Sequence, residues 1–232
     1  MSLLKMSYRN WKCLILALIF LLVVEQCYSQ ELEIELIARP ALTSLRGNDA
    51  AKNNFDPTYY FSTGLGVNYL FKNYSVINFA VLYDQKGGRG ESIILLRDSQ
   101  GQDIGEGIIT NEATFDYITI PIQWGQRFGQ KLKYQFGIGL YTSFLLKQEL
   151  TSKGLDGQVD AHEDNTEMYK KVDFGLSASF NVYVPFNDSF SFKVGLDDNL
   201  GLINVSDVPV SGDGTIKHNS LGISVGLNFW VK

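Results

Sequence analysis

The sequence predicts an all-β fold, namely a single eight-stranded antiparallel up-and-down transmembrane β-barrel preceded by a cleavable signal peptide. Three observations support this prediction. The first residues combine a basic segment with a short apolar run, hydrophobic residues then recur with a period of two, and short and long connections alternate between the predicted strands.

Residues 1–29 have the layout of a secretory signal peptide. Three basic residues come first: Lys5, Arg9 and Lys12. An uninterrupted apolar run follows at 13–24, and Ser29 is a small residue of the kind that precedes a cleavage point. Because the apolar run is shorter than the ~20 residues that a membrane-spanning helix needs, we expect cleavage after Ser29 and a mature protein that begins at Gln30.

Two alternatives to this cleavage remain. Residues 1–29 could stay attached as an N-terminal anchor helix, or the protein could be a lipoprotein acylated at Cys27. Glu25 and Gln26 argue against the lipoprotein, because large polar residues stand where such a signal has small ones.

Removing the predicted signal peptide changes the composition of the chain. Both cysteines, Cys13 and Cys27, are lost, which excludes a small fold held together by disulfides. The net charge falls from −5 to −7, because three of 20 basic residues and one of 25 acidic residues are removed. No basic stripe is left to neutralise phosphates, so nucleic-acid binding is not expected. Residues 30–232 have a length that suits one outer-membrane β-barrel domain.

Bulky apolar and small polar residues alternate with a period of two in four segments: 60–70, 134–144, 174–184 and 221–231. This period predicts β-strands rather than helices. In a soluble β-sandwich the polar face meets water and is rich in Lys, Glu, Arg and Thr. Here it is mostly Gly, Ser, Asn and Gln, which fit the crowded interior of a narrow barrel whose bulky apolar face meets lipid. The pattern therefore favours a membrane barrel over a soluble sandwich.

Eight strands are predicted, at 31–40, 58–71, 74–88, 114–128, 131–150, 168–186, 190–203 and 218–231. Three connections are short and carry turn residues: 72–73, 129–130 and 187–189. Four connections are long, near 41–57, 89–113, 151–167 and 204–217. This alternation is typical of bacterial barrels with short periplasmic turns and long external loops.

Two local features are expected to modify the predicted strands: one lengthens a hairpin and the other interrupts a ladder. The apolar stretch 92–96 in the second long connection is expected to extend the flanking hairpin above the membrane. Pro121 lies inside a predicted strand and has no N–H to donate to the ladder, so a bulge or a missing hydrogen bond is expected there.

Five segments carry a resemblance to a known family: FAVLYDQKGGRG (79–90), FDYITIPIQWGQRF (115–128), YQFGIGLYTSFLL (134–146), VDFGLSASFNVYVP (172–185) and LGISVGLNFW (221–230). Taken in this order, they resemble the PorT-like outer-membrane β-barrel proteins of Bacteroidota, which are similar in build to the small OmpA/OmpX-type barrels. The resemblance implies a β-barrel in the bacterial outer membrane, and it implies little about activity.

The last predicted strand resembles the C-terminal signal that barrel-assembly machinery recognises. The matching residues are Ser224, Gly226, Phe229 and Trp230. The strand departs from that signal by ending in Val231 and Lys232 rather than in an aromatic residue. Assembly machinery, outer-membrane lipid and lipopolysaccharide are the expected partners, and the protein is expected to be a monomer.

No catalytic, cofactor-binding or metal site is predicted. His162 lies in DAHED (160–164), and His218 would share a strand face with Ser220. Histidine beside Ser or Asp would suit a lipid-modifying enzyme of the outer membrane, but solvated loop and rim positions are preferred for both histidines. The acidic segment 156–167 has carboxylates that suit a hard cation, yet it lacks the spacing of a Ca²⁺ loop and is interpreted as a solvated loop.

Charged residues lie on the polar faces of the first and seventh predicted strands. They are Glu33, Glu35, Arg39, Lys193 and Asp197. Because an eight-stranded lumen is about wide enough for side chains only, these charges are expected to form an ion-pair network that plugs the barrel. A small gated pore is the alternative. Lys193 is expected within salt-bridge reach of Glu33 or Glu35, with Arg39 nearer the external rim.

These features favour a non-enzymatic outer-membrane barrel with a side-chain-filled lumen, acting in envelope structure or surface interaction through its long external loops. The alternatives are a narrow porin-like channel for small solutes and, less favoured, an outer-membrane lipid-modifying enzyme. The sequence identifies no ligand, partner or pathway.

Overall fold

The computed structural model describes residues 31–47, 55–97, 100–154, 159–210 and 213–231. The predicted signal peptide at 1–29 and the expected N-terminus at Gln30 lie outside these ranges. Within the described ranges, no helix is long and apolar enough to cross a membrane.

The described residues are almost entirely β-structure. The elements are β1 (Glu31–Arg46), β2 (Thr58–Leu70), β3 (Ser75–Arg97), β4 (Asp103–Phe128), β5 (Lys133–Lys153), β6 (Val159–Asp164), the 3₁₀ helix η2 (Thr166–Met168), β7 (Val172–Pro185), β8 (Phe190–Gly201) and β9 (Lys217–Val231). The strands coincide with the period-two segments of the sequence, as side chains that alternate between two faces require.

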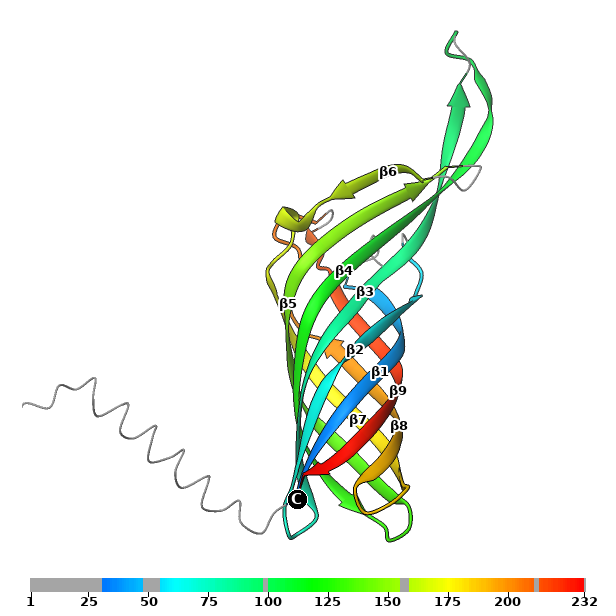
Figure 1. The fold of residues 1–232 in the computed structure, drawn as a ribbon. Coiled ribbons are helices and arrows are strands. Elements are labelled where there is room, and N and C mark those ends of the chain that lie inside the picture. Colours follow the sequence, from blue (N-terminus) through cyan, green and yellow to red (C-terminus); the bar gives the residue numbers. More distant parts are fainter. Residues whose placement is uncertain (1–30, 48–54, 98–99, 155–158, 211–212, 232) are drawn as a thin grey trace, which may run out of the picture.

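Eight of the strands close into an antiparallel ring (Figure 1). The hydrogen-bonded order is β4-β3-β2-β1-β9-β8-β7-β5, and pairing of β4 with β5 completes the ring. Closure leaves no free sheet edge in the wall. The predicted eight-stranded up-and-down barrel is therefore confirmed.

The region expected to be the third long loop contains additional structure. β7 pairs with β5 only as far as Val172 opposite Phe144, so the upper part of β5 has a free edge. The short strand β6 pairs with that edge and lies outside the ring, with η2 following it. The predicted strand 168–186 accordingly begins later, at Val172, and the segment 159–164 is a strand rather than a loop.

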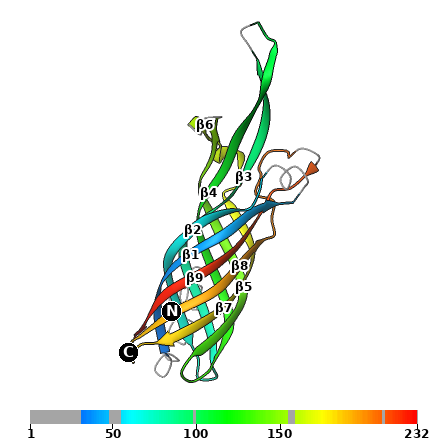
Figure 2. The same cartoon turned by 90° about the vertical axis from the view of Figure 1, so that its right-hand side faces the viewer.

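The β3–β4 hairpin extends far beyond the other strands (Figures 1 and 2). Its ladder continues from the barrel through Ile93 opposite Ile108 and Leu95 opposite Glu106. The apolar stretch 92–96 does extend the hairpin, as the sequence predicts.

The two ends of the barrel differ. Three short connections, 71–74, 129–132 and 186–189, lie at the same end as the start of β1 and the end of β9, which we call the short-turn end. The longer connections and the β3–β4 extension lie at the opposite loop end. This arrangement matches the predicted alternation of connections.

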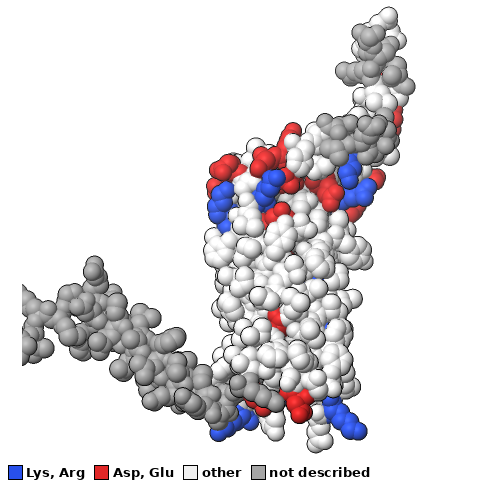
Figure 3. Space-filling view, in the orientation of Figure 1, with Lys and Arg blue, Asp and Glu red and all other residues white. Residues whose placement is uncertain are grey.

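The outer face of the barrel is apolar and the inner face is polar. In β7, Ser177 and Asn181 are buried, whereas Leu176 and Phe180 are exposed. Charged side chains gather at the two ends, and the surface between them is almost uncharged (Figure 3). Such a band suits lipid, and the small inward residues leave room for the larger polar side chains of the lumen.

Pro121 interrupts one of its two ladders. Between β3 and β4, Phe79 pairs with Ile122 and Leu82 with Thr119, and the two positions between them lack partners. The register is the same on both sides, so the feature is a gap rather than a bulge. Toward β5 the pairing is continuous, with Pro121 opposite Tyr141. The expected missing pairing is present on one side, because proline has no N–H to donate.

Candidate functional site

The lumen contains two layers of buried charged side chains. The turn-side layer, toward the short turns, comprises Glu33, Glu35, Arg127 and Lys193. The loop-side layer, farther along the strands, comprises Arg39, Asp84, Lys86 and Asp173. All eight side chains are nearly inaccessible to solvent. Buried charges of this kind are tolerated only when they are paired and hydrogen-bonded.

The pair Arg127–Glu33 anchors the turn-side layer. Nη1 and Nη2 of Arg127 donate to the two Glu33 carboxylate oxygens at 2.6 and 2.8 Å. Nε donates to Gln135 Oε1 at 2.9 Å, and the guanidinium lies 4.1 Å from the centre of the Tyr183 ring. A planar guanidinium can satisfy all these partners at once, which Lys could not.

Lys193 and Glu35 form the second ion pair of this layer. Asn68 connects the two pairs, since its Nδ2 lies 3.3 Å from an oxygen of Glu33 and 3.3 Å from one of Glu35. Asn78 in turn donates to Asn68 at 2.8 Å. The layer is therefore one connected network drawn from strands on several sides of the ring.

Asp84 is the centre of the loop-side layer. It accepts hydrogen bonds from Ser62 at 2.5 Å and Thr119 at 2.9 Å. The Lys86 ammonium lies 3.6 Å from it, and the Arg39 guanidinium 3.8 Å.

Lys86 extends the loop-side layer to β7. Its ammonium lies 3.3 Å from Asp173, which also accepts a hydrogen bond from Tyr141 at 3.0 Å. It also lies 5.0 and 4.5 Å from the ring centres of Tyr117 and Tyr141, within cation–π range.

The five charges predicted for the lumen do not form a single network. Glu33, Glu35 and Lys193 share the turn-side layer, whereas Arg39 belongs to the loop-side layer, nearer the loop end. Arg39 donates to the backbone carbonyl oxygens of Ser220 at 2.8 Å and Asp197 at 3.3 Å. The Asp197 carboxylate itself has no ion pair with these cations in the described part of the chain.

Sequence reasoning missed four charges that complete the two layers. They are Asp84, Lys86, Arg127 and Asp173. Each falls on the inward face of its strand, so the period of two could have found them. Asp84 and Lys86 lie near the middle of β3, but they are close to the end of the strand predicted at 74–88 and therefore resemble rim residues until the full strand length is known.

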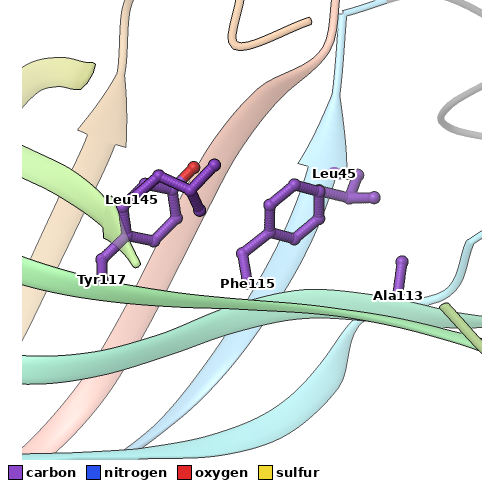
Figure 4. Close-up of a cluster of buried hydrophobic side chains, with 5 residues drawn as sticks. All are labelled: Leu45, Ala113, Phe115, Tyr117 and Leu145. Carbon is purple, nitrogen blue, oxygen red and sulfur yellow. The ribbon is translucent and has the colours of Figure 1, made fainter. Parts of the chain in front are cut away.

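A cluster of buried apolar side chains lies in the barrel toward its loop end (Figure 4). We call the cluster Leu45, Ala113, Phe115, Tyr117 and Leu145 the apolar cap. Tyr169 packs edge-on against Phe115 with ring centres 4.8 Å apart. Together with the two charged layers, the cap fills the lumen along most of its length.

His218 lies beneath this cap, and its predicted rim position is wrong. It is 1% exposed, its ring centre lies 4.7 Å from that of Phe115, and Nε2 is 3.2 Å from the Tyr117 hydroxyl. The β9 register places it inward, as it does Ser220. His218 therefore acts as a packed lumen residue, because the loop-end strands are longer than the sequence pattern indicated.

The second histidine, His162, is exposed on β6. Its Nε2 lies 2.7 Å from Glu149, which also pairs with Lys147. The hydrogen bond from Lys147 lowers the pKa of the Glu149 carboxyl. Among the described residues, no group of three or more His, Cys, Asp or Glu is arranged to hold a metal ion. Part of the acidic segment 156–167 lies outside those residues.

The residues of the predicted assembly signal occupy both faces of β9. Ser224 and Gly226 point into the lumen, whereas Phe229 points outward and contacts Phe190 with ring centres 5.1 Å apart. The Lys133 ammonium lies 4.4 Å from the centre of the Trp230 ring at the short-turn end.

Comparison with known proteins agrees with this architecture. Residues 29–207 match the family model described as outer membrane protein beta-barrel domain. No curated protein matches the sequence. Similar solved structures include Neisserial surface protein A (NspA), which is 14% identical, covers 85% of this chain and 96% of its own, and has a TM-score of 0.46.

Two further solved structures have a similar fold. Ail, the attachment invasion locus protein of Yersinia pestis, is 8% identical, with coverage of 86% of this chain and 98% of its own and a TM-score of 0.41. The outer membrane protease OmpT from Escherichia coli is 8% identical, with coverage of 87% and 96% and a TM-score of 0.33. The family match spans well over half of the chain, so the protein belongs to the outer membrane protein β-barrel domain family and is a β-barrel of the bacterial outer membrane.

Proposed function

We propose that the protein is a non-enzymatic outer-membrane barrel with a closed lumen, which acts in envelope structure or surface interaction through its external loops. The observation that carries this proposal is the filling of the lumen by the two charged layers and the apolar cap. We also propose that, within its family, the protein is of the PorT-like type that its sequence resembles.

The small size of the space between the two charged layers supports a closed barrel. The central cavity between the two charged layers has a volume of about 40 Å³. A cavity of this size has room for no more than a few water molecules. A narrow porin-like channel would require both layers and the cap to rearrange.

The position of His218 supports a non-enzymatic role. An acyl-transferring or lipid-modifying site needs a base that its substrate can reach. His218 is 1% exposed and packs against Phe115, and its Nε2 lies 3.2 Å from the Tyr117 hydroxyl.

The loop end offers the surface for interaction. The β3–β4 hairpin extends beyond the barrel with Ile93, Leu95 and Ile108 exposed. Short periplasmic turns and long external loops are the rule for these barrels, so this hairpin would face the cell exterior. Outer-membrane lipid, lipopolysaccharide and the barrel-assembly machinery remain the proposed partners, nucleic acid is not among them, and a monomer is the proposed state.

Conductance across planar lipid bilayers tests the closed lumen. The wild-type barrel is expected to conduct ions poorly, and the double variant Glu33→Ala/Arg127→Ala is expected to conduct poorly as well, because the loop-side layer and the apolar cap still fill the lumen. Lys153→Ala, a change near the end of β5, is the control and should behave as wild type. A large steady conductance from the wild type would favour the channel instead.

A further inference from the structure

We propose that the outer wall of β1 and β9 binds a phosphate group of lipid A, the lipid part of lipopolysaccharide, through Arg46 and Lys217. The two strands run side by side in the barrel (Figure 2), and both residues belong to their loop-end parts. The inference rests on the proposed function, because it needs the loop end to face the cell exterior, and it gives the proposed lipopolysaccharide partner a specific site.

Two like charges stand directly opposite each other in this wall. Arg46 pairs with Lys217 in the antiparallel β1–β9 ladder, so their side chains point to the same side of the sheet. The neighbouring Leu45 and His218 are buried in the lumen, which places the two cations on the outer side. Because like charges in opposite positions destabilise a sheet, this pair favours an anion between or beside the two side chains.

The described part of the chain does not supply that anion. Neither Arg46 nor Lys217 lies within ion-pair distance of a carboxylate of a described residue. One Nη of Arg46 donates to the backbone carbonyl oxygen of Gly201, and its Nε is buried without a hydrogen-bond partner. The guanidinium is therefore held against β8 and β9 while its charge remains uncompensated.

The charge balance of this outer surface is positive. Among the described residues of β1, β8 and β9, the outward-facing charged side chains are Arg46, Lys217 and Asp198. Asp198 is opposite Leu221, farther into the lipid-facing band, and it forms an ion pair with neither cation. Two cations against one carboxylate leave one positive charge in excess, which suits an anionic ligand.

The two cations stand where lipid headgroups are expected. Toward the membrane, the outward row of β1 continues with Ser44 and Leu42, and that of β9 with Asn219 and Leu221. Leu42 and Leu221 are exposed and opposite each other at the upper edge of the apolar face. Tyr59 is opposite Leu42 on the other side and is 78% exposed. Because tyrosine favours the interface between membrane and water, it marks the level of the headgroups.

Polar and apolar groups of this surface together match lipid A. Ser44 and Asn219 are opposite each other directly below the cations, so a hydroxyl and an amide adjoin a guanidinium and an ammonium. These four groups can all donate hydrogen bonds to phosphate oxygens. The exposed leucines below them contact acyl chains. A free phosphate ion would use only the upper half of this surface, whereas a phosphorylated lipid uses both.

Native mass spectrometry of the full barrel in a neutral detergent tests the site, with purified bisphosphorylated lipid A as the probe. The wild type is expected to retain lipid A. Lys217→Glu is expected to lower its affinity about tenfold or more, because the substitution removes a cation and gives Arg46 a partner within the protein. Equal retention by the wild type and this variant overturns the proposal.

Lys171→Glu is the matched control. Lys171 is also a loop-end cation, but it pairs with Glu167. The substitution changes the net charge by the same amount as Lys217→Glu, and lipid A retention should stay at the wild-type level. Equal losses in the two variants would assign the effect to the overall charge of the loop end and overturn the specific site.

Unfolding temperatures provide a second test that does not depend on retention. In neutral detergent Lys217→Glu should be at least as stable as the wild type, since an opposite charge then stands across from Arg46. Lipid A should raise the unfolding temperature of the wild type and not that of the variant, because ligands that bind the folded state stabilise it. A variant less stable than the wild type in neutral detergent would contradict the repulsion on which the proposal rests.

Two further probes identify the ligand chemistry. Dephosphorylated lipid A should not be retained, and its retention at the level of intact lipid A would contradict recognition of the phosphate. Inorganic phosphate that raises the unfolding temperature as much as lipid A does would assign the site to a free anion and overturn the lipid. Conductance tests the proposed function separately: a conducting wild type that retains lipid A contradicts only the closed lumen, and a closed barrel that does not retain it contradicts only this site.

Discussion

Glu33 and Arg127 join β1 to β4 across the lumen, although these strands are not neighbours in the ring. Both carboxylate oxygens accept hydrogen bonds from the guanidinium, at 2.6 and 2.8 Å. A two-point pair of this kind fixes orientation as well as distance. It therefore holds the short-turn end of the barrel closed from within.

Arg127→Ala is expected to destabilise the barrel strongly. The substitution leaves the Glu33 carboxylate buried without its cation, and breaking a buried pair in this way costs about 3–5 kcal/mol. The free energy of unfolding in urea, followed by the mobility difference between folded and unfolded barrel on gels, measures the loss.

The double variant Glu33→Gln/Arg127→Met is the matched comparison. It removes both charges and keeps most of the volume, so its loss of stability should be smaller than that of Arg127→Ala. If the single variant were no less stable than Lys153→Ala, the pair would not stabilise the barrel as described.

A charged residue introduced at mid-strand on the lipid-facing side should impair assembly of the barrel. Ile138 is 60% exposed and Phe180 is 46% exposed on the lipid-facing side. Ile138→Arg or Phe180→Arg should impair assembly, because an Arg at the bilayer midplane costs roughly 2–4 kcal/mol. The yield of folded barrel in purified outer membranes measures the effect.

Ser179→Ala, on the opposite face, is the control for these substitutions. Ser179 donates to Gln123 at 2.7 Å, so its loss should cost only about 0.5–1.5 kcal/mol. Equal damage from both faces would mean that the assignment of inside and outside is wrong.

The period of two was sufficient to predict the ring of eight strands. It identified both faces of β2, β5, β7 and β9, because in these strands a mostly small or polar row faces the lumen and a bulky apolar row faces lipid. It did not predict β6, whose pairing depends on how far β5 extends beyond β7. That length is a property of the assembled sheet and not of either segment alone.

The charged layers were only partly predictable, for the same reason. Glu33 and Glu35 alternate with apolar residues near the start of a strand, so their face could be assigned from the sequence. Arg127 lies near the end of a strand, and its partner is 94 residues away. Which charges meet across the ring depends on the stagger of all eight strands, which no local pattern contains.

N-terminal sequencing of protein from outer membranes tests the predicted processing. The mature chain should begin at Gln30, because a basic segment, a short apolar run and Ser29 precede it. Mass spectrometry that instead found an acylated Cys27 would identify a lipoprotein.

The two histidines should differ in reactivity toward diethylpyrocarbonate. The side chain of His162 is 54% exposed, whereas His218 is 1% exposed beneath the apolar cap. His162 should therefore be modified in the folded barrel and His218 only after unfolding, as peptide mass spectrometry would record. The denatured protein, in which both react, is the control. Equal modification in the folded state would place His218 in contact with solvent.

Lys193→Ala should destabilise the barrel far more than Lys153→Ala. Lys193 is 5% exposed and pairs with Glu35, while Asn68 links that carboxylate to Glu33. Removing the ammonium leaves Glu35 without a cation in the turn-side layer, which costs about 3–5 kcal/mol for a buried pair.

The comparison with Lys153 separates this effect from the general loss of a lysine. Lys153 ends β5 at the loop end, where water solvates its charge, so its removal should cost at most about 1 kcal/mol. Lys193→Met, which retains the packing of the aliphatic stem but not the charge, should remain nearly as unstable as Lys193→Ala, because the uncompensated Glu35 carboxylate is the cause. A Lys193→Met barrel as stable as the wild type would show that packing, and not the ion pair, is what Lys193 contributes.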